Sequence, residues 1–78
     1  MNSLAMRVLR LFGEMGKELL DLHVLFEAAG NEPSERGRVL DAIDELVGLD
    51  MLKARGSDFY ELTESGKRAI AERGAAKD

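Results

Sequence analysis

The 78-residue chain contains no cysteine and no tryptophan, one proline and one histidine, and aromatic residues make up only 5% of it. Without cysteine it can form no disulfide, which is consistent with a reducing compartment. No apolar run approaches the roughly 20 residues that span a bilayer. Arg7 and Arg10 interrupt the apolar N-terminal stretch, which argues against a signal peptide. We therefore expect a cytoplasmic protein with no membrane segment.

Signatures of catalysis and metal binding are equally scarce. A lone His23 cannot build a zinc site without cysteine ligands, and we interpret it as a structural residue. The eight glycines are scattered and form no phosphate-binding loop. No serine is paired with a general base by any motif. We expect no enzyme activity, no metal and no cofactor.

The chain does have an ordinary hydrophobic fraction of 45%, which is typical of a globular domain and argues against disorder. Its length predicts a single domain, which we place at residues 1–74, with residues 75–78 as a frayed tail. The net charge is −4. This charge is unfavourable for simple nucleic-acid binding, because phosphate contacts need cations, although the charge at the contact surface matters more than the total.

Apolar residues at helical spacing predict a first helix over residues 3–15 and a second over residues 22–29. Gly16 suits a left-handed C-cap of the first helix. Asp21 is a candidate N-cap of the second. Residues 17–20 form a short connection between the two.

A third helix follows a turn that contains a proline. It begins at Pro33, which suits a first helical turn, or after Ser34 as the N-cap, and it ends at Gly48 or Asp50. Its apolar residues cover an arc of about 120°, which is typical of a core-facing stripe. The predicted core stripe consists of Val39, Leu40, Ile43, Leu46 and Val47.

Two short strands and a last helix complete the pattern. Residues 51–55 and 59–63 have the composition of strands, and Gly56 lies at the turn between them. Thr63 is the expected N-cap of a final helix. The predicted order is helix, connection, helix, turn, helix, hairpin and helix.

Residues 60–66 match the motif Tyr-x-Leu-Thr-x-x-Gly, and Ile43 and Leu46 match a Leu-x-x-Leu pair on the preceding helix. With this element order, the chain resembles the winged helix-turn-helix superfamily, most of all regulators of the multiple-antibiotic-resistance and phenolic-acid types. The resemblance implies an α+β fold with a three-helix core, a wing of two or three strands and a short C-terminal helix. It also implies that residues 17–20 pair as a short strand with the wing.

The chain departs from the family at one position. In the family, a Gly-Leu pair follows the third helix at the positions of Asp50 and Met51, whereas the Gly-Leu pair of this chain is Gly48 and Leu49. Either Asp50 adopts the left-handed conformation, or the third helix ends two residues early. The terminal helices are also short for a family that dimerises through long ones, so dimerisation in the family manner is not expected.

The resemblance implies a DNA-binding transcriptional regulator whose partner is double-stranded DNA. The third helix would enter the major groove through Ser34, Arg36 and Arg38. The wing would contact the phosphate backbone through Lys53 and Arg55, which lie on one face of a strand.

An alternative function is a protein–protein interaction module of the same fold with little or no DNA binding. It follows from three carboxylates on or beside the outward face of the third helix, which repel phosphate: Asp41, Asp44 and Glu45. A homodimer or partner interface is also expected from three apolar residues outside the core stripes, unless the terminal helix covers them: Met6, Leu9 and Val24.

Overall fold

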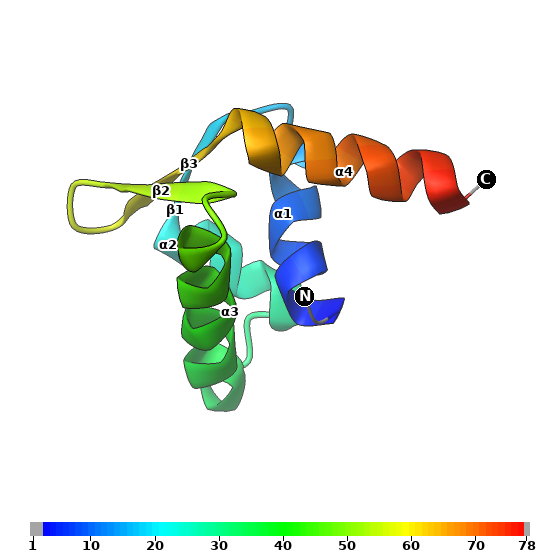
Figure 1. Cartoon of the computed structure of the whole chain (residues 1–78). Coiled ribbons are helices and arrows are strands. Elements are labelled where there is room, and N and C mark those ends of the chain that lie inside the picture. Colours follow the sequence, from blue (N-terminus) through cyan, green and yellow to red (C-terminus); the bar gives the residue numbers. More distant parts are fainter. Residues whose placement is uncertain (1–2, 78) are drawn as a thin grey trace.

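The computed structural model describes residues 3–77 of the chain, with side chains described for residues 3–72. Helices and strands follow one another along these residues, and the strands form one small sheet, as Figure 1 shows. The elements are α1 (Ser3–Met15), β1 (Leu19–Asp21), α2 (Leu22–Leu25), the 3-10 helices η1 (Phe26–Ala29) and η2 (Pro33–Glu35), α3 (Arg36–Gly48), β2 (Leu52–Arg55), β3 (Phe59–Leu62) and α4 (Glu64–Lys77).

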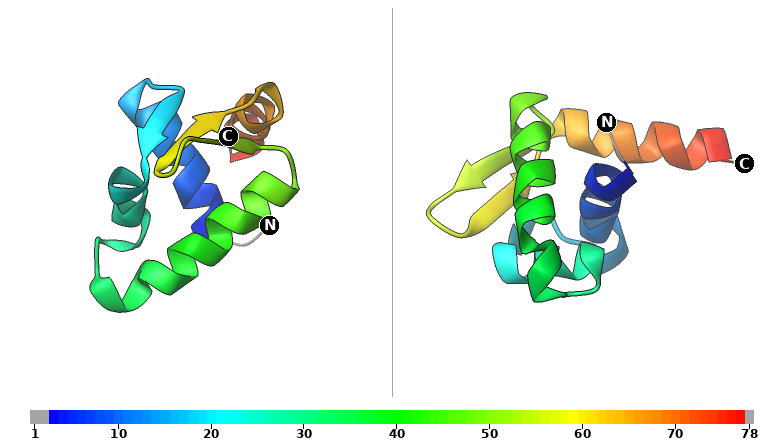
Figure 2. Two further views of the ribbon diagram at one scale, coloured as in Figure 1. Left: turned by 90° about the vertical axis from the view of Figure 1, so that its left-hand side faces the viewer. Right: turned by 90° about the horizontal axis from the view of Figure 1, so that it is seen from below.

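The three strands form one antiparallel sheet in the order β1-β3-β2. Tyr60 in the central strand lies opposite Leu20 of β1 and Ala54 of β2. The hairpin of β2 and β3 and the helix α4 project from the helical core in different directions (Figures 1 and 2). The connection between the first two helices pairs with the wing as predicted, but the strand spans Leu19–Asp21 and not residues 17–20.

Local hydrogen bonds explain where the early helices begin and end. The carboxylate of Asp21 accepts a hydrogen bond of 2.7 Å from the main-chain N–H of His23, so Asp21 is the N-cap of α2 as predicted. Gly16 takes the left-handed conformation, with φ +65°. The predicted second helix is divided into α2 and η1, and Ser34 lies inside η2 and is not an N-cap.

The end of α3 combines both alternatives that the sequence left open. The helix ends at Gly48, and Asp50 takes the left-handed conformation with φ 62°. The N–H of Met51 donates to the carbonyl of Leu46 at 2.9 Å, and the N–H of Asp50 donates to that of Val47 at 3.0 Å. These two bonds form a Schellman motif, in which Asp50 occupies the position that glycine usually fills.

The helix α1 lies at the centre of the core, in contact with α3, α4 and η1. Because neighbours pack around it, most of the circumference of this largely apolar helix is buried, and Arg7 and Glu14 mark the face that stays exposed. Met6 is 4% exposed and Leu9 is 0% exposed, so the prediction that they form a partner interface is wrong. Val24 is partly buried and packs against the same core.

The core stripe of α3 differs from the prediction in its direction. Its buried residues are Val39, Ala42, Ile43 and Leu46. At about 100° per residue this stripe is centred between Val39 and Leu46, not on Ile43. Leu40 and Val47 therefore turn toward solvent and are 40% and 38% exposed.

The motif that closes the hairpin joins β3 to α4. Leu62 enters the core, and the Thr63 hydroxyl accepts a hydrogen bond of 3.0 Å from the N–H of Gly66, which makes Thr63 the N-cap of α4 as predicted. The helix continues to Lys77, through residues 75–77 that were predicted to be a frayed tail, and Asp78 lies outside the described residues. No helix within residues 3–77 has the length and apolar character needed to cross a membrane.

Candidate nucleic-acid interface

The helix α3 lies along one side of the molecule with one face buried and one face open (Figure 2). The buried face packs against α1 and η1. Opposite the centre of the buried stripe are Gly37, Asp41, Asp44 and Gly48, all of them exposed. The open face therefore centres on small residues and carboxylates.

The predicted DNA-contacting residues of the third helix gather at its start. Ser34 is exposed in η2, two residues before the start of α3. The guanidinium carbon of Arg36 lies 5.2 Å from the centroid of the Phe26 ring, within the range of a cation–π contact. The Arg38 guanidinium donates to the carboxylate of Glu35 at 2.5 Å. Both arginines are exposed at this end of α3, but they are two residues apart on the helix, so their side chains extend from different sides of it.

The predicted wing cations lie on the outer face of the sheet. Lys53 and Arg55 alternate with Leu52, which is buried, so both point away from the core. The Arg55 guanidinium donates to the carboxylate of Glu61 at 2.7 Å, across the β2–β3 pair. Lys53 is opposite Glu61 in the register. Two exposed apolar side chains, Phe59 and Leu19, share this face of the sheet.

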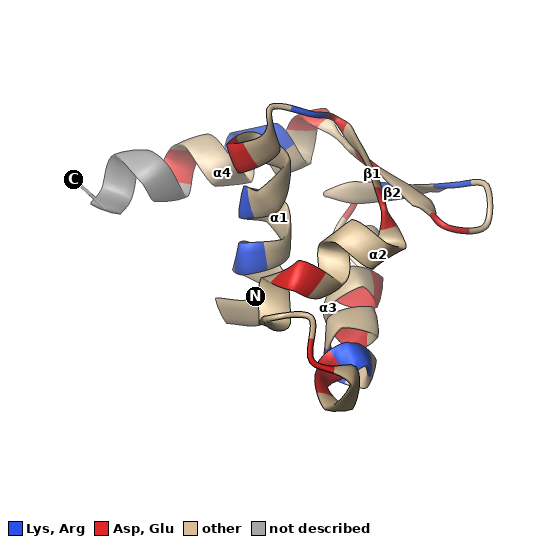
Figure 3. Ribbon diagram, turned by 180° about the vertical axis from the view of Figure 1, so that it is seen from behind, with Lys and Arg blue, Asp and Glu red and all other residues tan. Residues whose placement is uncertain are grey.

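The structure does not bring the two pairs of cations together. Arg36 begins α3, whereas Lys53 follows its last turn, and the 13 residues of the helix are about 20 Å long. Residues 39–52, between the two pairs, contain four carboxylates and no lysine or arginine. Figure 3 shows the acidic bands of α3 beyond the basic segment at its start. The candidate interface thus has exposed cations at both ends, where Arg38 and Arg55 are paired with Glu35 and Glu61, and it has carboxylates without cations in the middle.

The ion pairs of Arg38 and Arg55 are exposed and therefore weak. The side chain of Arg38 is 69% exposed and that of Arg55 is 55% exposed. Pairs of this kind contribute about 0–1 kcal/mol, because water screens them. Either arginine can exchange its carboxylate for a phosphate at small cost.

Two ionisable groups outside this surface have shifted pKa values. Hydrogen bonds from the backbone N–H and the side chain of His23 lower the pKa of Asp21. Hydrogen bonds to Glu18 and Glu64 raise the pKa of Lys67. The Lys67 ammonium lies 2.8 Å from Glu18, so it ties the start of α4 to the segment before β1. Both groups cap or link elements of the fold.

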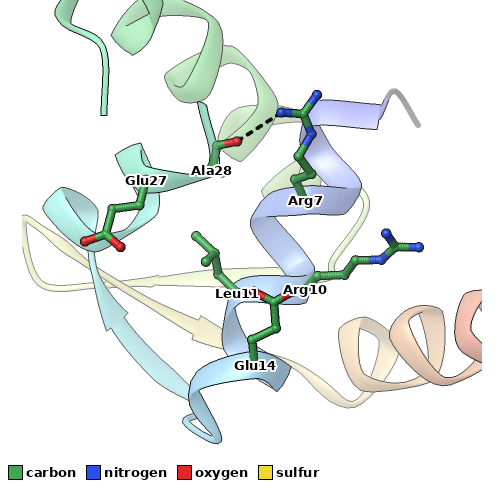
Figure 4. A pocket seen from close by; sticks show the side chains of 6 residues that line it. All are labelled: Arg7, Arg10, Leu11, Glu14, Glu27 and Ala28. Carbon is green, nitrogen blue, oxygen red and sulfur yellow. Dashed lines mark hydrogen bonds between the residues drawn. The ribbon is translucent and has the colours of Figure 1, made fainter. Parts of the chain in front are cut away.

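A shallow groove of about 190 Å³ opens between α1 and η1, away from α3's open face (Figure 4). Its lining residues are Arg7, Arg10, Leu11, Glu14, Glu27 and Ala28. Arg7 donates to the carbonyl of Ala28 at 3.3 Å, while Figure 4 shows Arg10 and Glu27 pointing away from each other. The groove is smaller than the 300–1,000 Å³ of typical ligand pockets, so we centre the site on α3 and the wing.

Within residues 3–77, no group of three or more histidine, aspartate or glutamate side chains is placed to hold a metal ion. No family model, no curated protein and no solved structure matches the chain. Its architecture, four α-helices with a three-stranded antiparallel sheet, is compatible with a winged-helix layout.

Sequence reasoning missed the exposure of Leu40 and Val47, which it assigned to the core. Ala42 was the available signal. It is 2% exposed, and counting it as part of the stripe moves the stripe's centre away from these two residues. A small apolar residue is easily omitted from a hydrophobic stripe, although it is often where two helices approach most closely.

Proposed function

We propose that the chain binds double-stranded DNA as a winged-helix domain, and that it acts as a small transcriptional regulator. The observation that carries the proposal is the position of two exposed cation groups, one at the start of α3 and one on the wing that follows it. The helix between them has one solvent-exposed face. Winged-helix and related domains place a helix in the major groove, with its N-terminal residues on base edges.

The start of α3 has the chemistry for such contacts. Arginine presents a planar fork that binds guanine or phosphate through two parallel hydrogen bonds. The contact with the Phe26 ring favours a position of the Arg36 guanidinium beside the N-terminus of α3. The pair with Glu35 is exposed, so Arg38 is available to DNA. Ser34, one turn earlier, adds a hydroxyl that can donate to a phosphate.

The wing supports a second point of attachment. Lys53 and Arg55 extend from one face of β2 and suit phosphate contacts. The 13 residues of α3, about 20 Å of helix, separate the first cation group from the turn that leads into the wing, so the two groups suit contacts at separate points of a duplex. Insertion through the start of α3 leaves Asp41 and Asp44 farther from the groove floor, though they still weaken binding.

Fluorescence anisotropy with a labelled random-sequence duplex at low salt tests the proposal. We expect micromolar affinity that falls steeply with salt, because phosphate contacts release counterions. Arg38→Ala should weaken binding by about 1–3 kcal/mol, and Lys53→Ala should weaken it and reduce the salt slope by about one.

Arg10→Ala is the matched control, because Arg10 lines the groove between α1 and η1 and lies off the proposed interface. Binding by this variant should equal that of the unmodified chain. The absence of micromolar binding at low salt would contradict the proposal, as would equal losses for Arg10→Ala and Arg38→Ala.

A protein-interaction module is the second candidate function. The specific observation in its favour is the combination of exposed apolar and acidic side chains in the middle of α3, where a DNA-binding helix usually carries cations.

A further inference from the structure

The middle of α3 carries a strip of exposed side chains, which we call the α3 strip. It consists of Leu40, Asp41, Asp44 and Val47. Leu40 and Val47 are seven residues apart and Asp44 lies between them, so these three share one side of the helix. The strip combines two apolar side chains with two carboxylates on one continuous surface.

The apolar members of the strip are partly exposed to solvent. Leu40 is 40% exposed and Val47 is 38% exposed, and Leu49 beyond the end of α3 is 48% exposed. Isolated exposed apolar residues are common, but a pair at heptad spacing is the arrangement with which one helix packs along another.

The charge around the strip selects the class of partner. Its charged members are Asp41 and Asp44, and the chain has no lysine or arginine between Arg38 and Lys53. Nucleic acids and anionic membrane surfaces are repelled by such a surface. A partner that covers it must therefore supply both cations and apolar side chains.

We propose that the α3 strip binds a basic amphipathic helix of a partner protein. The apolar side chains of the partner helix pack against Leu40 and Val47, and its lysine or arginine side chains pair with Asp41 and Asp44. The proposal does not depend on DNA binding. A helix seated on the strip lies between the two cation groups of α3 and the wing, so it excludes DNA from α3 if DNA binds there.

The test titrates the full chain into a labelled synthetic peptide of leucine and lysine, about five helical turns long, with leucine on one face. We expect binding at micromolar to tens-of-micromolar concentrations. A peptide of the same composition with scrambled order has no apolar face and should bind at least about tenfold more weakly. A leucine–glutamate peptide with the original pattern should show no binding.

Asp41→Asn/Asp44→Asn removes the two charges with little change in shape, and it should weaken peptide binding about tenfold. Leu40→Ala/Val47→Ala should weaken it by a similar factor. Both pairs are exposed, so a thermal unfolding curve measured by circular dichroism should remain cooperative for each variant.

Glu14→Gln/Glu27→Gln is the matched control, because it also removes two carboxylates but at the groove between α1 and η1. Equal losses for the control and for Asp41→Asn/Asp44→Asn would overturn the proposal, since binding would then report net charge alone. Equal binding of the patterned and scrambled peptides, or no binding of the patterned one, would overturn it too. In the DNA assay, Asp41→Asn/Asp44→Asn should strengthen binding, so the two proposals can fail separately.

Discussion

The hydroxyl of Thr63 donates a hydrogen bond of 2.7 Å to the main-chain carbonyl of Asp50. The hydroxyl oxygen of Thr63 also accepts a hydrogen bond of 3.0 Å from the N–H of Gly66. The main-chain N–H of Thr63 donates to the carbonyl of Met51 at 3.2 Å. One threonine thus joins the N-terminus of α4 to the left-handed turn that ends α3. The orientation of the helix relative to the hairpin depends on this junction.

Thr63→Ala should lower the free energy of unfolding by about 1–2 kcal/mol, because it removes both the N-cap of α4 and the bond to Asp50. Thr63→Ser keeps the hydroxyl and should recover most of the loss. Urea unfolding followed by circular dichroism measures both variants. Equal stability of the alanine and serine variants would show that the hydroxyl contributes nothing.

Gly66 is packed more closely than any other glycine of residues 3–72. A Cβ atom there would collide with the carbonyl oxygen of Met51 and would lie 2.6 Å from a methyl group of Leu62. The Met51 carbonyl belongs to the backbone of the junction and cannot move aside easily. We therefore expect Gly66→Ala to lower the free energy of unfolding by about 1–3 kcal/mol.

Gly48→Ala is the matched control for this substitution. A Cβ at Gly48 meets nothing within 4 Å, and the residue is the last of α3. Alanine has the higher helix propensity, so this variant should be neutral or more stable, by up to about 1 kcal/mol. The opposite order of the two variants in urea unfolding would contradict the packing at Gly66.

The local rules predicted much of the fold from the sequence. Asp21 and Thr63 were recognised as helix caps, and Gly16 as a left-handed position, because each depends on neighbours in the chain. The direction of the α3 stripe was predicted less well, since it depends on how α1 and η1 pack around it. Met6 and Leu9 were misassigned for the same reason. The pattern of α1 alone does not show how many other elements pack around it, and α3, α4 and η1 all do.

The ion pairs within the candidate site could not be read from the positions of its cations in the sequence. The sequence indicated Arg38 and Arg55 as cations of an interface. Arg38 donates to the carboxylate of Glu35 and Arg55 to that of Glu61. These pairs depend on the positions of the side chains in the folded structure. The Arg55–Glu61 pair also depends on the register of the β2–β3 pairing.

Stability should depend on pH through Asp21. Hydrogen bonds from His23 lower the pKa of this carboxyl below its ordinary value of 3.8. The folded state therefore binds a proton less readily than the unfolded state. The stabilisation is present in full above the ordinary pKa, and it is lost as the pH falls through the lowered pKa of the folded state.

Asp21→Ser separates this effect from capping itself, because serine caps helices without an ionisable carboxyl. At neutral pH the unmodified chain should have the higher Tm, and the difference between the two Tm values should shrink as the pH falls below about 4. Differential scanning calorimetry across this range measures it. A difference that stays constant with pH would rule out a role for the Asp21 charge.

The carboxylates of Glu35 and Glu61, which pair with Arg38 and Arg55, should lower the affinity for DNA. Glu35→Gln and Glu61→Gln each remove the charge beside an exposed arginine, at an ion-pair distance of 2.5 Å and 2.7 Å respectively. Under the proposed function, each variant should bind duplex DNA more tightly, by about two- to fivefold at low salt, since an exposed pair is worth about 0–1 kcal/mol. Glu14→Gln makes the same change in net charge at the groove beside α1 and should alter DNA affinity less. Anisotropy titrations at several salt concentrations measure all three. If Glu14→Gln strengthens binding as much as Glu35→Gln does, the effect comes from net charge, and neither Arg38 nor Arg55 is released by the loss of its partner.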